Sequence, residues 1–270
     1  MIKNIDFYYF SGTGNTLLAV KKMAEVFEKN GIKISLNNIE NTNPQMINKN
    51  HTIGLAFPVA GFSTYPFIWD FIKAMPNTEG TKIFMVDTLA GFSGGIVTPL
   101  KKVLKKKGYE TIGAIEIIMP SNIFYIYPDK INTVIVKNGL KKAEEYAREI
   151  ISEKSKWKTL FIFSDVFYIF YQQVVRKSWL NKWNQKWFGF KVDKNKCTKC
   201  GICARLCPVK NISQPSTIEG FPIFGATCNF CMRCLSLCPH KAIPCNFNFK
   251  GKTYIANGIN PESLLINNQN

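Results

Sequence analysis

The residues Phe10-Ser11-Gly12-Thr13-Gly14-Asn15-Thr16 connect two segments with different hydrophobic patterns. The apolar run from Ile2 to Phe10 predicts a strand, and the periodic segment from Asn15 to Asn30, ending at Gly31, predicts a helix. A loop between a strand and a helix N-terminus presents backbone N–H groups and the helix dipole to an anion. This hydroxyl-rich loop therefore predicts a phosphate site at the end of the first strand.

The residues at particular positions of the loop limit which kind of phosphate ligand it can bind. Leu17 stands where the dinucleotide pattern G-x-G-x-x-G requires its third glycine. No lysine follows Gly14, so the loop also lacks the G-K-[ST] of nucleoside triphosphate loops. A monophosphate held by hydrogen bonds and dipoles fits best, and a plain turn with a helix cap is the alternative.

The first half of the chain continues to alternate between strand and helix patterns. Further strands are expected at residues 32–36, 52–57, 82–88 and 109–118, and further helices at 66–74, 95–107 and 129–153. Strands separated by helices indicate a parallel sheet covered on both faces. Residues 1–153 are therefore expected to form an α/β domain with a flavodoxin-like five-stranded parallel sheet.

Two further loops follow strands at the edge where open α/β sheets bind ligands. Residues 58–66 and 88–95 each combine glycine with an aromatic residue, and Phe62, Tyr65 and Phe92 are candidates to cover a flat ring. Ordinary loop packing is the alternative for these aromatic residues. The predicted cofactor-binding residues are Ser11, Gly12, Thr13, Gly14, Asn15, Thr16, Pro58, Val59, Ala60, Gly61, Phe62, Thr88, Gly91, Phe92 and Gly94.

All nine cysteines lie in the last third of the chain. Eight of them form the pattern C-x2-C-x2-C-x3-C-P twice, a spacing in which three thiolates surround one cubane and the fourth reaches the other. The predicted [4Fe-4S] ligands are Cys197, Cys200, Cys203 and Cys238 for cluster 1, and Cys228, Cys231, Cys234 and Cys207 for cluster 2. Two zinc sites are the alternative, although zinc favours pairs of CxxC with a long spacer. Cys245 is expected to be a small buried hydrophobic residue.

Composition limits the class of protein. The 270 residues, at about 150 residues per domain, predict two domains. A formal charge of +17 excludes an acidic carrier and suggests an anionic partner. The chain has no run of 18 apolar residues and no cleavable leader pattern, and its cysteines do not form a short secreted disulfide scaffold. We therefore expect a cytoplasmic protein.

The segment at 154–190 has an unusual composition. It contains four of the five tryptophans, interleaved with Lys and Arg, and predicts one or two helices. A helical brace between the domains is favoured, and a helix on a membrane surface is the alternative. Residues 191–250 are expected to form the small α+β iron–sulfur domain, and residues 251–270 a polar tail.

The loop at residues 11–16 resembles the flavin mononucleotide (FMN) phosphate loop of flavodoxins, and the doubled cysteine run resembles bacterial two-cluster ferredoxins. Nearly the whole chain resembles the flavodoxin–ferredoxin fusion proteins of anaerobic bacteria and archaea. The resemblance implies phosphate contacts at Ser11, Thr13, Asn15 and Thr16, ring contacts from residues 58–65 and 88–95, and eight cysteine ligands. The basic charge departs from the acidic surfaces usual around these cofactors.

The expected function is electron transfer between FMN and two [4Fe-4S] clusters, and on to a redox protein that the positive charge suggests is acidic. A flavin-dependent reductase of a small molecule and a membrane-surface redox protein are the alternatives. An electron carrier is favoured over a substrate-specific oxidoreductase, because no acid–base pair suggests a catalytic site. His51 and His240 are expected at the surface or in packing roles. No motif for specific nucleic-acid recognition accompanies the charge.

Overall fold

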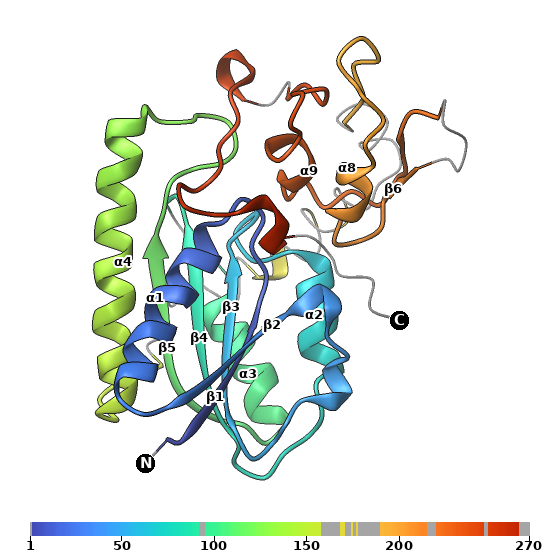
Figure 1. The fold of residues 1–270 in the computed structure, drawn as a ribbon. Helices are drawn as coiled ribbons and strands as arrows, with labels where there is room; N and C mark the ends of the chain where they lie inside the picture. The colour runs from blue at the N-terminus through green and yellow to red at the C-terminus, as the bar shows by residue number, and fades with distance from the viewer. Residues whose placement is uncertain are drawn as a thin grey trace.

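The computed structural model describes residues 2–91, 95–157, 168–170, 174, 177, 190–214, 220–245 and 248–264. Five parallel strands form its centre: β1 (Asn4–Tyr9), β2 (Lys33–Asn38), β3 (Thr52–Pro58), β4 (Lys82–Leu89) and β5 (Glu110–Ile118). They lie in the order β2-β1-β3-β4-β5 (Figure 1). This is the flavodoxin-like order of a doubly wound sheet, so the predicted fold class is confirmed.

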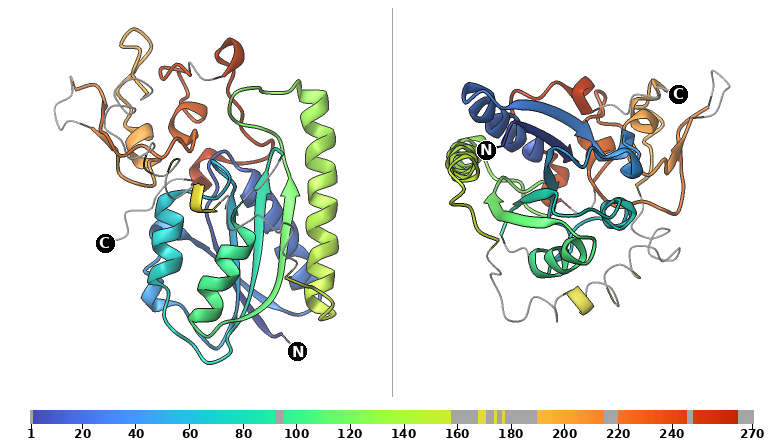
Figure 2. Two further views of the ribbon diagram at one scale, coloured as in Figure 1. Left: turned by 180° about the vertical axis from the view of Figure 1, so that it is seen from behind. Right: turned by 90° about the horizontal axis from the view of Figure 1, so that it is seen from below.

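Helices cover both faces of the sheet (Figure 2). On one face α1 (Asn15–Lys29) and α4 (Asp129–Ile151) share a core with strand residues such as Phe84 and Val86. On the other face α2 (Pro66–Ala74) and α3 (Val97–Lys106) pack on Ile83 and Met85. Successive side chains of a strand point to opposite faces, so a strand covered on both faces is apolar throughout. Two short 3-10 helices, η1 (Ile39–Asn41) and η2 (Pro44–Met46), follow β2.

The cysteine-rich domain, residues 190–245, lies over the carboxyl ends of the five strands (Figure 1). Its elements are short: α8 (Ile202–Arg205), the antiparallel pair β6 (Ile212–Ser213) and β7 (Ile223–Phe224), and α9 (Arg233–Ser236). Phe190, Leu235 and Ile243 belong to its small core, which also contains the buried Cys245. So few apolar side chains make a weak core, and such a domain depends on bound metal for stability.

The end of the chain packs on the first domain. After the 3-10 helix η4 (Phe249–Gly251), the side chains of Tyr254, Ala256 and Ile259 are buried in the core that contains α1, and Leu264 of η5 (Pro261–Leu264) joins them. The expectation of a polar tail is therefore wrong at Tyr254, Ala256, Ile259 and Leu264. A few apolar residues spaced among polar ones carried too little pattern to reveal this packing.

Most of the aromatic segment at 154–190, including Trp179, Trp183 and Trp187, lies outside the described residues. Trp157 is described: its Nε1 donates to the Val97 carbonyl at 3.1 Å, and its backbone bridges to Ala114 of β5. This segment therefore begins by packing on α3 and the edge of the sheet. In the described part of the chain, no helix combines the length and the apolar character needed to cross a bilayer.

Candidate functional site

A pocket opens at the carboxyl ends of the strands. Loops after β1, β3, β4 and β5 form its walls, because all parallel strands end at the same edge of the sheet. The residues that line it are Ser11, Gly12, Thr13, Asn15, Thr16, Pro58, Val59, Thr88, Leu89, Ala90, Met119, Pro120, Ser121, Asn122 and Ile123. The pocket combines hydroxyl and amide groups, which suit a phosphate, with apolar side chains, which suit a ring system.

Hydrogen bonds hold the first loop in shape. The Ser11 hydroxyl accepts from the backbone N–H groups of Gly14 and Leu17 at 3.1 and 3.3 Å. The hydroxyls of Thr16 and Thr88 are 2.8 Å apart, which ties the first loop to the end of β4. Gly14 has a φ of 102°, and a Cβ there would lie 2.8 Å from Ile259, so the loop requires glycine at this position.

Eight predicted cofactor-binding residues line the pocket: Ser11, Gly12, Thr13, Asn15, Thr16, Pro58, Val59 and Thr88. Gly14, Ala60, Gly61, Phe62 and Gly91 lie in the same loops but outside the lining, and Phe92 and Gly94 lie outside the described residues. The loop after β3 folds on itself, since Ala60 and Ser63 exchange two backbone hydrogen bonds around Gly61 and Phe62. Tyr65 packs in the core against Phe10, with ring centroids 5.6 Å apart.

One wall of the pocket was not predicted from the sequence. Met119, Pro120, Ser121, Asn122 and Ile123 follow β5, and the Asn122 side chain donates to the Thr13 hydroxyl at 3.2 Å. This segment has no glycine beside an aromatic residue, the feature that singled out the other two loops. Its position directly after the fifth predicted strand was the signal that could have revealed it.

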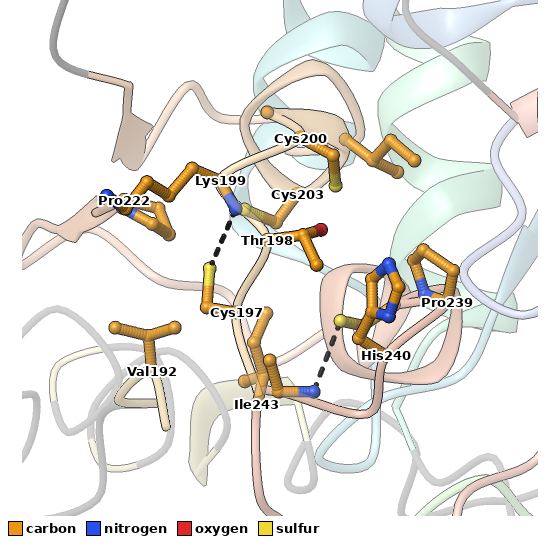
Figure 3. Close-up of a pocket in the computed structure, with 14 residues that line it drawn as sticks. Val192, Cys197, Thr198, Lys199, Cys200, Cys203, Pro222, Pro239, His240 and Ile243 are labelled. Atoms are coloured by element: carbon orange, nitrogen blue, oxygen red, sulfur yellow. Dashed lines mark hydrogen bonds between the residues drawn. The ribbon is translucent and has the colours of Figure 1, made fainter. Parts of the chain in front are cut away.

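The two cysteine sets predicted from spacing each surround one cavity. Cys197, Cys200, Cys203 and Cys238 line one cavity, here called the distal site (Figure 3). Cys207, Cys228, Cys231 and Cys234 line a second cavity, here called the proximal site. Among the described residues, no three His, Cys, Asp or Glu side chains converge on a point that would hold a single metal ion. Four sulfur atoms around a cavity suit a cubane, whose irons lie apart from one another.

Backbone N–H groups point at sulfur in both sites. In the distal site Lys199 donates to Cys197 Sγ at 3.4 Å and Ala242 to Cys238 Sγ at 3.3 Å (Figure 3). In the proximal site Asn211 donates to Cys207 Sγ at 3.1 Å and Phe230 to Cys228 Sγ at 3.3 Å. Such bonds stabilise negative charge on sulfur and help to set the reduction potential of a bound cluster.

Burial disfavours the thiolate form of several cysteines in the two sites. It raises the pKa of Cys203 and Cys231 to about 11 and that of Cys228 to about 12. Thiolates in these surroundings require a cationic partner, which the irons of a cluster supply, so metal binding releases protons. The donor set therefore fits iron–sulfur clusters.

The proximal site touches the loop after β1. A Cβ added to Gly12 would lie 2.5 Å from the Cys231 carbonyl oxygen, which is closer than real Cβ contacts allow. Cys207, Cys231 and Cys234 are buried, whereas Cys200 of the distal site is exposed. The pocket and the proximal site therefore share a boundary, and the distal site reaches the surface.

Arg233 connects the sheet domain to the cysteine-rich domain at this boundary. Its Nη1 lies 2.7 Å from Glu40 Oε1, and the two side chains are 1% and 2% exposed. Its Nε and Nη2 donate to the Ser11 carbonyl at 3.2 and 2.7 Å, and its guanidinium carbon lies 4.6 Å from the centre of the Phe10 ring. Arg233 also stands between Cys231 and Cys234, two predicted ligands, in the sequence. The same side chain therefore contacts the loop, the sheet domain and the segment that holds the proximal site.

The end of the chain covers the other side of the loop. The Tyr254 hydroxyl lies 2.8 Å from Asn15 Oδ1, and the Ala256 N–H donates to the Thr13 carbonyl at 2.9 Å. The loop is thus held from both sides by residues far away in the sequence.

Comparisons with known proteins agree with this division of the chain. Residues 196–243 match the family model of the 4Fe-4S dicluster domain, which indicates two [4Fe-4S] clusters. No curated protein matches the chain.

Solved flavodoxins align with little more than half of the chain. That of Streptococcus pneumonia TIGR4 is 13% identical with a TM-score of 0.43, covering 56% of this chain and 99% of its own. Flavodoxin 2 of Bacillus cereus is 15% identical with a TM-score of 0.42, covering 54% and 99%. Megasphaera elsdenii flavodoxin is 20% identical with a TM-score of 0.38, covering 51% and 98%. The strand order, rather than these alignments, carries the fold assignment.

Proposed function

The chain joins a flavodoxin-like domain to a 4Fe-4S dicluster domain, and on that premise we propose that it transfers electrons between bound FMN and two clusters, and on to a redox protein. When bound, a flavin exchanges one or two electrons and each cubane exchanges one. The proposal rests above all on the contact between Gly12 and Cys231, because it joins the flavin-side loop to a ligand of the proximal site.

The pocket supports FMN as the flavin. The hydroxyls of Ser11, Thr13 and Thr16 and the amide of Asn15 would hold the phosphate, together with the N-terminus of α1. Pro58, Val59 and Met119 would contact the ring system. The same loop disfavours a dinucleotide, since Leu17 stands where a third glycine is required.

The burial of the cysteines supports an order of sites from pocket to surface. The proximal site adjoins the pocket and has three buried cysteines, and the distal site has the exposed Cys200. The buried ion pair of Arg233 and Glu40 holds the pocket and the proximal site in a fixed relative position. Moving the two sites apart would break this pair and expose its charges. Two centres held in one chain exchange electrons at a high effective concentration.

A flash experiment tests the function. The full chain is reconstituted anaerobically with iron, sulfide and FMN, and a flash-generated reductant then delivers less than one electron per molecule. The flavin and cluster absorbance bands should re-equilibrate at a rate that does not depend on protein concentration. A rate proportional to protein concentration would mean transfer between molecules and would contradict the proposal.

A further inference from the structure

The distal site is the more accessible of the two cysteine sites. Cys200 is exposed and Cys197, Cys203 and Cys238 are half-buried, whereas most of the proximal cysteines are buried. Electron transfer between proteins weakens steeply with the distance between redox centres. A partner from solution would therefore approach the distal site.

Three lysines lie at or beside residues that line this site. The Nζ atoms of Lys194 and Lys199 lie 5.5 and 4.9 Å from the centre of the Phe221 ring. Lys199 and Pro222 line the distal cavity, and the exposed Lys241 follows His240, which also lines it (Figure 3). An aromatic ring flanked by two ammonium groups thus stands at the rim of the distal site.

The lysines of this rim are not neutralised by carboxylates of the described residues. In the part of the chain that the structure describes, Lys194, Lys199 and Lys241 form no ion pair, and Asp193 pairs with Lys196 at 3.5 Å. Residues 190–245 contain eight Lys and Arg against two Asp and Glu. Two oxidised clusters with their thiolates carry about −2 each, which leaves the domain basic.

We propose that the rim formed by Lys194, Lys199, Phe221 and Lys241 is the docking surface for an acidic redox protein, an inference that rests on the proposed electron-transfer function. Carboxylates of the partner would pair with the lysines, and an apolar contact would form on Phe221. One electron passes between the two proteins: the reduced centre of the partner is oxidised by one electron and the distal cluster is reduced by one. No bond forms or breaks.

The test is stopped-flow mixing of the oxidised holoprotein with a reduced, small, acidic [4Fe-4S] ferredoxin. The second-order rate constant should fall at least about tenfold between 0.01 and 0.1 M salt, because the Debye length shrinks from about 30 to about 10 Å. At 0.01 M salt the variant Lys194→Glu/Lys241→Glu, which changes two exposed lysines of the rim, should react at least about tenfold more slowly than the wild type.

A matched control changes the same charge elsewhere. Lys21 on α1 and Lys137 on α4 are exposed, so Lys21→Glu/Lys137→Glu alters the net charge equally on the sheet domain. This variant should keep the wild-type rate constant within about twofold, since local charge steers docking more than net charge. Both variants should retain the wild-type iron content and the wild-type rate of transfer between flavin and clusters.

Three results would overturn the docking surface. They are a rate constant that does not depend on salt, equal slowing by the two double variants, and binding to phosphatidylglycerol vesicles that the rim variant abolishes while its rate constant stays at the wild-type value. In each case an unchanged flash-induced transfer within the chain would leave the proposed function standing. Loss of that internal transfer in the wild type would instead reject the proposed function itself.

Discussion

At the scale of single residues, Arg233 is the side chain on which the junction depends most. It is fully buried, pairs with Glu40 and donates to Ser11, so no water is available to replace its partners. Removing one member of a buried ion pair leaves the other charge without compensation. Removing both members can be close to neutral.

We therefore predict that Arg233→Met lowers the free energy of unfolding by about 3–5 kcal/mol. The double variant Glu40→Gln/Arg233→Met should recover most of that loss, because it no longer buries a lone carboxylate. Thermal unfolding of the anaerobic holoproteins measures both. If the double variant is as unstable as Arg233→Met, the ion pair is not the reason for the loss.

Asp87 is a second unusual residue. Its side chain is fully buried, neither carboxylate oxygen has a partner among the described residues, and Glu116 lies opposite it in the register of β4 and β5. Burial, and then the charge of Glu116, raise the pKa of Asp87 well above its usual value, against the opposing charge of Lys142. The folded state therefore holds this proton more tightly than the unfolded state does.

A carboxyl with a raised folded pKa stabilises the fold below its ordinary pKa, and this contribution is lost as pH rises toward the folded value. Asp87→Asn should therefore stabilise the protein more at pH 8 than at pH 5.5, with a slope of at most about 1.4 kcal/mol per pH unit. Thermal unfolding across this range measures the difference. Glu110→Gln, at an exposed position on β5, serves as the control and should show no such trend. A pH-independent effect of Asp87→Asn would contradict the raised pKa.

At the scale of elements, the loop between β1 and α1 has two tasks. It carries the hydroxyls that would bind a phosphate, and it contacts the proximal site through Gly12. Different residues perform the two tasks, so substitutions can separate them.

Thr13→Ala/Thr16→Ala removes two hydroxyl donors from the pocket. A hydrogen bond to a charged group contributes about 1.5–3 kcal/mol, so the affinity for FMN should fall at least about tenfold. The affinity for riboflavin, which lacks the phosphate, should change little. Flavin fluorescence titration measures both affinities, and unchanged FMN binding would place the phosphate elsewhere.

Gly12→Ala adds a methyl group against the Cys231 carbonyl, where backbone must move to admit it. Overpacking of this kind costs about 1–3 kcal/mol of stability. We also expect slower transfer between flavin and clusters in the flash experiment, because the proximal site is pushed from the loop. Gly91→Ala, whose added Cβ meets no atom of the described residues within 4 Å, is the control. Equal rates in the two variants would show that the contact does not set the rate.

At the scale of the whole molecule, the sheet domain has a large core on each face, whereas the cysteine-rich domain has a small one. The two are also joined by shared packing, since Leu206 and Leu237 belong to the core of α1 and α4. The small domain therefore depends on its clusters and on its neighbour.

The full chain should contain about eight irons and eight sulfides after anaerobic reconstitution. Removing the iron with a chelator should expose the buried thiol groups of the cysteine-rich domain, because metal binding supplies its folding energy. Iron and sulfide analysis, with EPR of the reduced protein, measures the clusters. Stoichiometric zinc without iron would contradict the assignment.

Local patterns in the sequence determined the elements and the cysteine sets of this protein. The helix at 66–74 was predicted at its observed bounds, and each cysteine set, predicted from its spacing, surrounds one cavity. Both depend on neighbours within a few residues: helices and strands repeat every 3.6 and 2 residues, and thiolates two residues apart reach one cubane.

Only the tertiary structure decided what meets at the end of the sheet. Four features each join segments that are far apart in the chain. They are the wall formed by residues 119–123, the pair of Arg233 with Glu40, the contact of Gly12 with Cys231 and the burial of Tyr254. Such contacts depend on where separate elements pack. The residues next to an arginine or a glycine in the sequence do not indicate which distant residue it will contact. The sequence therefore predicted the redox centres, and the packing of distant segments decided which of them adjoins the pocket.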